Sequence, residues 1–144
     1  YNIVRFFNVY GVNQKRNFVI PKFIAQIRRS KNLTVFGNGR QIRSFCNVED
    51  AVRGLLLVMT KGKKNEVYNI GNNNEPISMS NLAKKIKKLS NSKVKIQKID
   101  FKDSDRSKDR EIFKRYPDLI KIKKHTGYRP KINLDVGIKR LLTK

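Results

Sequence analysis

The sequence has almost no cysteine and no long apolar run. A single cysteine, Cys46, stands among 144 residues, so no disulfide can form within the chain and a reducing compartment suits it best. No apolar stretch approaches the roughly 20 residues that span a bilayer, and the first residues lack the charged, apolar and small-residue order of a signal peptide. These absences favour a soluble, cytoplasmic protein with no membrane partner.

Acidic residues are also scarce. The chain has 11 aspartates and glutamates against 34 lysines and arginines, a formal net charge of +23. Such a field attracts nucleic acid, anionic membranes and phosphate ligands. The lysines are spread over many segments, however, and neither interleaved aromatic residues nor zinc-ligand spacings accompany them. A nucleic-acid partner is therefore not expected, and accumulation of lysine at the surface is the simpler explanation.

What is present is an alternation of strand and helix patterns. With 38% hydrophobic residues, the chain predicts one globular domain, and the alternation indicates an α/β fold. Residues 102–115 are charged without clear periodicity and are expected to form a loop. Strands are expected at 2–8 (a buried strand), 33–37, 66–71 and 93–99, and helices at 20–30, from Asn47 to the KGKKN stretch, from Ser78 or Ser80 to Leu89, from Pro117 to Gly127 and from Leu134 to Leu142.

The stretch LTVFGNGRQIRSFCNVEDAVRGL, residues 33–55, is the most informative about chemistry. Gly37 and Gly39 predict a sharp turn, and Arg43 follows shortly before the helix that begins at Asn47. Arginine offers a phosphate a planar, two-pronged contact that lysine cannot match. By spacing alone, an ordinary surface arginine beside a turn is an equally good interpretation. Cys46 is expected to be a small core residue rather than a nucleophile.

Five motifs carry a family resemblance: RFFNVYG, VIPKFIAQ, the 33–55 stretch, VYNIGNNNE and RYPDLIKIKKHTGYRPKINLDVGIKRLL. In this order and spacing they resemble the C-terminal, substrate-binding half of the extended short-chain dehydrogenase/reductases, the NAD-dependent epimerase/dehydratase family that modifies nucleotide sugars. NDP-sugar 4-epimerases, dTDP-glucose 4,6-dehydratases and UDP-glucuronate decarboxylases are among its members. The resemblance covers nearly the whole chain and implies the short strands and helices of a Rossmann-like α/β fold.

The NAD-binding half of that family carries a glycine-rich turn and a Tyr-x-x-x-Lys pair ahead of these motifs. Neither occurs in this sequence. We therefore expect residues 1–144 to represent the substrate-binding half, with the N-terminal Rossmann part absent and no catalytic residues present. The chain alone is expected to be inactive, NAD to be bound mainly by the absent half, and the full-length enzyme to be a homodimer.

The resemblance also implies roles for individual residues. Phe7 and Tyr10 are expected beside the nicotinamide end of the cleft, as cofactor contacts. No metal ligands are expected. The other residues are expected to contact the nucleotide-diphosphate sugar. Asn8 is expected near the diphosphate or the sugar, Arg43 at the diphosphate, and Arg106 and Asp109 over phosphate and ribose. Asn17, Phe18 and Val19 are expected to line the substrate, Thr34 and Phe36 to flank the nucleobase, and Asn72 or Asn74, of which Asn74 is chosen, to add a polar contact.

Two functions from different classes follow. The first is a nucleotide-sugar-modifying NAD-dependent epimerase, dehydratase or decarboxylase, represented by its NDP-sugar-binding half. The alternative is a non-catalytic basic module, on a remnant of that fold, that binds nucleic acid or a protein partner. Selectivity for base and sugar would mark the first, and a steep loss of affinity with salt would mark a nucleic-acid binder.

Overall fold

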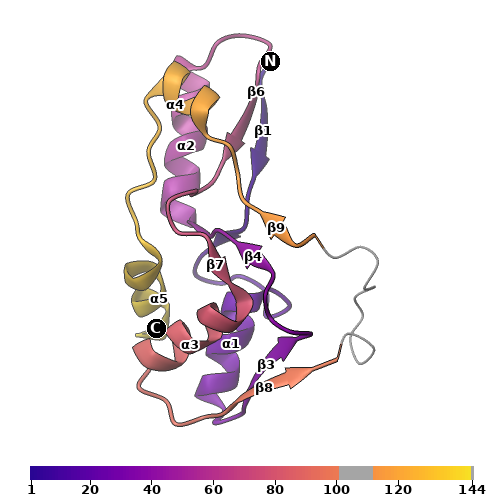
Figure 1. Cartoon of the computed structure of the whole chain (residues 1–144). Coiled ribbons are helices and arrows are strands. Elements are labelled where there is room, and N and C mark those ends of the chain that lie inside the picture. Colours follow the sequence, from indigo (N-terminus) through magenta and orange to yellow (C-terminus); the bar gives the residue numbers. More distant parts are fainter. Residues whose placement is uncertain (101–111, 144) are drawn as a thin grey trace. The chain divides into compact units, whose positions relative to one another are not determined.

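The computed structural model describes residues 1–100 and 112–143. Helices and strands alternate along the chain, which confirms the α/β class, and they form two compact units (Figure 1). Unit 1 consists of residues 1–11, 44–76 and 116–137, and unit 2 of residues 12–43, 77–115 and 138–144.

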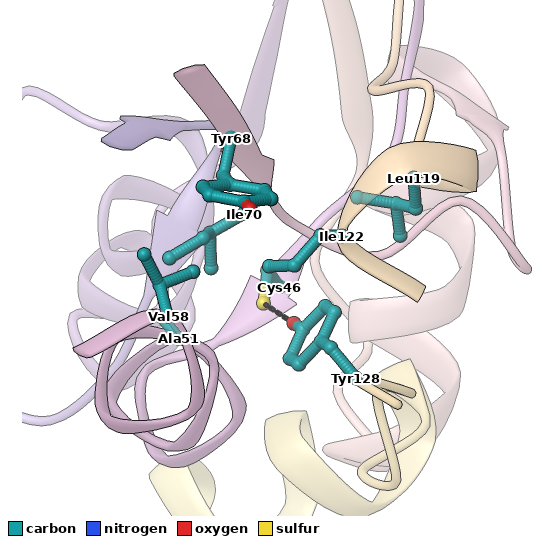
Figure 2. Close-up of a cluster of buried hydrophobic side chains, with 8 residues drawn as sticks. All are labelled: Cys46, Ala51, Val58, Tyr68, Ile70, Leu119, Ile122 and Tyr128. Atoms are coloured by element: carbon teal, nitrogen blue, oxygen red, sulfur yellow. Dashed lines mark hydrogen bonds between the residues drawn. The ribbon is translucent and has the colours of Figure 1, made fainter. Parts of the chain in front are cut away.

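Unit 1 is built on two pairs of parallel strands. Strand β1 (Ile3–Phe6) pairs with β6 (Val67–Ile70), and β2 (Val9–Tyr10) pairs with β5 (Cys46–Asn47). Helices α2 (Val48–Lys61) and α4 (Ile120–Thr126) pack against β6 and against each other. Figure 2 shows the core that they enclose, formed by Cys46, Ala51, Val58, Tyr68, Ile70, Leu119, Ile122 and Tyr128.

Helix α2 begins where the sequence predicts. The Asn47 side chain caps it by accepting a hydrogen bond from the backbone N–H of Glu49 at 2.9 Å, and acidic residues in the first turn suit the positive end of the helix dipole. Its broad apolar face is divided, however. Ala51 and Val58 are buried, whereas an outer stripe remains exposed, consisting of Val48, Val52, Leu56 and Met59.

Strand β1 corrects the prediction of a buried strand at 2–8. The side chains of Ile3 and Phe6 are 48% and 47% exposed. The only strand that pairs with β1 among the described residues is β6, and an apolar run is buried on both faces only where further layers cover its sheet. The sequence pattern thus indicates the strand correctly but not its surroundings.

Unit 2 is built around β3 (Leu33–Phe36), which pairs in parallel with β8 (Ile96–Ile99). Helices α1 (Val19–Arg28) and α3 (Met79–Leu89) pack against β3. Strand β4 (Ile42–Arg43) lies between β7 (Ile77–Ser78), which is antiparallel to it, and β9 (Lys114–Arg115), which is parallel. The core of unit 2 includes Ile20, Phe23, Ile24, Leu33, Val35, Leu82, Ala83 and Ile86.

The helix boundaries agree with the sequence except at the end of α1, which is Arg28 rather than residue 30, and at the start of α4. Ser78, rather than Ser80, caps α3 by accepting from the Asn81 N–H at 3.2 Å. Helix α4 begins at Ile120, later than Pro117, and ends at Gly127 with a left-handed φ of 73°. Helix α5 spans Leu134–Leu142, as predicted. Of the loop predicted at 102–115, residues 102–111 lie outside the described residues, and Lys114–Arg115 form strand β9 instead.

Candidate functional site

A polar cluster lies where the parallel strands β1 and β6 end in unit 1. Asn8 follows β1 with a left-handed φ of 42°, and its Nδ2 donates to the Ser44 carbonyl at 2.9 Å. The Ser44 hydroxyl in turn donates to the carbonyl of Asn72, which follows β6. The carboxyl ends of parallel strands are where open α/β sheets bind ligands, so this cluster is the structural centre of the candidate site in unit 1.

Of the three asparagines after β6, the two candidate contacts, Asn72 and Asn74, differ in their surroundings. Asn72 is buried, and its Oδ1 accepts from the backbone N–H of Asn74 at 2.8 Å. The Asn72 side chain therefore closes the turn, whereas Asn74 is exposed. This difference favours Asn74 as the ligand contact, and that role stays a prediction.

The two residues expected beside the nicotinamide differ in burial within unit 1. Phe7 is half-buried, and its backbone N–H donates to the Ile70 carbonyl at 2.9 Å. Tyr10 is only 2% exposed, and its hydroxyl has no hydrogen-bond partner among the described residues. The phenol lies against Gly137, where an added Cβ would be 1.8 Å from the Tyr10 oxygen. Burial raises the pKa of Tyr10 far above its usual value, which keeps the phenol neutral.

In unit 2, helix α1 contacts both residues expected beside the nucleobase. Gln26 Nε2 donates to Thr34 Oγ1 at 2.9 Å, and the Thr34 N–H donates to Gln26 Oε1 at 3.3 Å. One helical turn earlier, Lys22 Nζ lies 4.4 Å from the centre of the Phe36 ring, a cation–π distance. Thr34 and Phe36 are thus brought together with a cationic and an amide side chain.

Arg43 lies on β4 and is half-buried. Its Nη1 donates to the carbonyls of Ile42 at 2.9 Å and Phe113 at 3.4 Å, which anchor the guanidinium near β9. The preceding turn is confirmed: Gly37 and Gly39 have φ values of 60° and 67°. A side chain at Gly39 would also overlap Ser80, because its Cβ would lie 2.1 Å from Ser80 Oγ.

The other predicted contacts are placed as follows. Asn17 and Phe18 are exposed ahead of α1, and Val19 is its first residue. Arg106 and Asp109 lie outside the described residues. Within unit 1 the structure describes Phe7, Asn8, Tyr10 and Asn74, and within unit 2 Asn17, Phe18, Val19, Thr34, Phe36 and Arg43.

Sequence reasoning missed three residues of these arrangements. Ser44 connects the two strand ends but has no motif of its own. Lys22 and Gln26 are four residues apart on α1, a spacing that puts both on one face of a helix. This spacing could have indicated that the two side chains lie together. It does not indicate which residues that face of the helix contacts.

The buried thiol of Cys46 has the surroundings of a core residue. Its Sγ lies 3.6 Å from the Tyr128 hydroxyl (Figure 2), and burial raises the pKa of the thiol to about 11. A thiol protonated at neutral pH is a poor nucleophile. Among residues 1–100 and 112–143, no group of three His, Cys, Asp or Glu side chains is placed to hold a metal ion. In the same part of the chain, no helix is long and apolar enough to cross a membrane.

Comparison with known proteins defines the class. Residues 1–71 match the NAD dependent epimerase/dehydratase family. The chain is 34% identical to a UDP-N-acetyl-alpha-D-glucosaminuronate decarboxylase of Bacillus cytotoxicus, over 97% of this chain and 44% of that protein. It is 36% identical to the dTDP-D-glucose 4,6-dehydratase of Bos taurus, over 97% of this chain and 39% of that protein.

Solved structures agree with these relatives. The UDP-glucose 4-epimerase of Thermotoga maritima, solved with UDP-glucose, superposes with a TM-score of 0.88 at 30% identity, over 99% of this chain and 45% of that one. The UDP-glucuronic acid 4-epimerase of Bacillus cereus, solved with UDP-glucuronic acid and NAD, superposes with a TM-score of 0.83 at 28% identity, over 95% of this chain and 42% of that one.

The fold is thus that of Rossmann-like nucleotide-sugar enzymes. By sequence and by structure, the chain is similar to members of the NAD dependent epimerase/dehydratase family, whose model matches its residues 1–71. It spans less than half the length of the curated relatives it matches.

Proposed function

We propose that this chain is the nucleotide-sugar-binding half of an NAD-dependent epimerase, dehydratase or decarboxylase. The observation that carries the proposal is the cluster of Asn8, Ser44 and Asn72 at the carboxyl ends of β1 and β6. Its position is that of ligand sites in open α/β sheets. The relatives solved with UDP-glucose and UDP-glucuronic acid support the choice of ligand class.

The contacts predicted within the two units differ in kind. Asn8 and Asn74 of unit 1 offer neutral amide groups for sugar or phosphate oxygens. In unit 2, Arg43 offers a charged fork for the diphosphate, and Phe36 offers a ring for the nucleobase. Arg106 and Asp109 remain predicted contacts, on the basis of the family resemblance of the sequence.

NAD does the redox chemistry of such enzymes when it is bound. The two residues predicted to contact it fit poorly as a dinucleotide site by themselves, because the Tyr10 ring is buried and its hydroxyl lies against Gly137. The role proposed for residues 1–144 is therefore to bind and orient the sugar nucleotide, with NAD held mainly by other residues. We further propose a homodimeric, cytoplasmic full-length enzyme, whose oligomeric state can be measured by light scattering.

The test is calorimetric titration with UDP, dTDP and ATP, on the parent chain and on Arg43→Lys and Arg40→Lys. Both substitutions keep the charge, but only the first removes a guanidinium from the proposed diphosphate site. A charge-assisted contact is typically worth about 1.5–3 kcal/mol, so Arg43→Lys should weaken binding of UDP and dTDP roughly 10-fold or more, and Arg40→Lys should not. Equal binding of ATP, or loss of affinity only in Arg40→Lys, would contradict the proposed site.

A further inference from the structure

The positive charge of the chain is concentrated in unit 2. Unit 1 has 10 basic and 6 acidic residues, whereas unit 2 has 24 basic and 5 acidic residues. Four of those acidic residues fall within 101–111, so the described part of unit 2 combines 19 lysines and arginines with a single acidic residue, Asp100. A general accumulation of lysine would affect both units. The difference between them requires a cause specific to unit 2.

Three basic segments of unit 2 meet at one place. The 28–32 and 87–95 segments are joined where β3 and β8 begin, since the Leu33 N–H donates to the Lys95 carbonyl at 2.9 Å and the Lys95 N–H to Asn32 Oδ1 at 3.2 Å. The 138–143 segment joins them through Arg28 Nη2, which donates to the Leu141 carbonyl at 2.9 Å. We call the exposed cations of these segments the basic end: Arg28, Arg29, Lys31, Lys88, Lys93, Lys95, Lys139 and Arg140.

Helix dipoles account for only part of this cluster. Arg28 and Lys139 lie near helix ends, where the partial negative charge of the last carbonyls favours cations. Lys31, Lys93 and Lys95 lie beyond the ends of α1 and α3 and do not share that benefit. No acidic residue occurs in any of the three segments. Like charges gathered in this way repel one another and destabilise the compact state, and a bound polyanion would relieve the repulsion.

The side chains between these cations indicate what kind of polyanion fits. Ser30, Asn32, Asn91 and Ser92 are hydrogen-bonding residues of the types that contact phosphate oxygens in nucleic-acid complexes. None of the strongly exposed large hydrophobic residues lies in the three segments, so these segments offer nothing to insert into a bilayer. The three segments also contain no aromatic residue to stack on bases.

We propose that the basic end of unit 2 binds the phosphate backbone of nucleic acid without regard to base sequence. The sequence alone argued against such a partner because its lysines look evenly spread. The division of the chain into two units shows that the positive charge is concentrated in unit 2. This surface is separate from the residues proposed to contact the sugar nucleotide, and its test does not depend on them.

The experiment measures binding of the parent chain to a random-sequence DNA duplex by fluorescence anisotropy across a salt series. Each phosphate contact contributes about 0.9 to the slope of log affinity against log salt. The triple variant Arg29→Gln/Lys31→Gln/Lys95→Gln should therefore bind more weakly, with a slope shallower by about 2–3. A second duplex of different sequence should bind the parent equally well.

The matched control is Lys63→Gln/Lys64→Gln/Lys123→Gln, which removes the same charge from exposed positions of unit 1. It should bind like the parent, and both variants should keep the parent's circular dichroism spectrum. Equal loss of affinity in the two variants would show that net charge alone attracts the duplex and would overturn the proposal. So would absence of duplex binding at low salt, or binding only to phosphatidylserine vesicles offered in parallel.

Discussion

Replacing Asp50 with alanine is expected to destabilise unit 1 strongly. The Asp50 side chain is fully buried, and its carboxylate accepts hydrogen bonds from the backbone N–H groups of Lys131 and Ile132 at 3.0 and 2.9 Å. Arg53 Nη2 donates to the same carboxylate at 2.6 Å. Alanine leaves the two backbone donors without their acceptor, and each buried donor left unsatisfied costs about 1–3 kcal/mol.

With two such donors, the expected loss is about 2–6 kcal/mol. That is a large share of the roughly 5–15 kcal/mol by which domains are usually stable. Arg53→Ala should cost much less, because the Arg53 side chain is 33% exposed and the two backbone donors keep their acceptor. The loss of stability in Asp50→Asn should lie between the losses in Arg53→Ala and Asp50→Ala. The amide retains one acceptor oxygen but turns an N–H donor toward Arg53.

Urea unfolding followed by tyrosine emission measures these changes in unit 1. The chain has no tryptophan, and all five tyrosines lie in unit 1, so intrinsic emission reports that unit. The urea concentration at the unfolding midpoint should be lowest for Asp50→Ala, higher for Asp50→Asn and highest of the three for Arg53→Ala. If Arg53→Ala proves as costly as Asp50→Ala, the ion pair rather than the backbone contacts is the stabilising element, and the reasoning is refuted.

Three further outcomes are expected. Gly137→Ala should lower stability by about 1–3 kcal/mol through overpacking against the Tyr10 oxygen, and Tyr10→Phe in the same chain should recover part of the loss in urea unfolding. Because burial raises the pKa of Cys46 from 9.0 to about 11, the unfolded thiol ionises first, so the urea midpoint should fall as pH rises between these values, and less so in Cys46→Ala. The hydrogen bond from Lys121, at 2.8 Å, lowers the pKa of Glu66, so the pair's contribution is present at neutral pH and lost on acidification. In Lys121→Ala the Glu66 pKa measured by NMR should rise toward its ordinary value, and an unchanged pKa would contradict that cause.

Local patterns predicted the helices and longer strands well because their causes are local. The Asn47 cap, the Gly127 stop and the apolar spacing of α3 each lie within a few residues of the element they define. The two-residue strands β2, β4, β5, β7 and β9 were not predicted, since such short pairings depend on partners distant in sequence.

The candidate site was predictable in part for a similar reason. The position of Asn8 after a strand and the turn before Arg43 follow from short-range patterns. The contact of Ser44 with Asn72, the burial of Tyr10 and the approach of Lys22 to Phe36 depend on tertiary packing. The uneven charge of the two units was likewise invisible, because each unit is assembled from three separate segments.

This interleaving of segments constrains how the protein can be made. Strand β1 needs β6, whose paired residues are 64 positions later, and β3 needs β8, whose paired residues are 63 positions later. Closing such long loops slows folding. On the ribosome, unit 1 cannot be completed until residues 116–137 have emerged, by which time most of unit 2 is already outside the exit tunnel. Neither unit can therefore be released by cutting the chain once, and both must reach their final pairing after residues 116–137 have emerged.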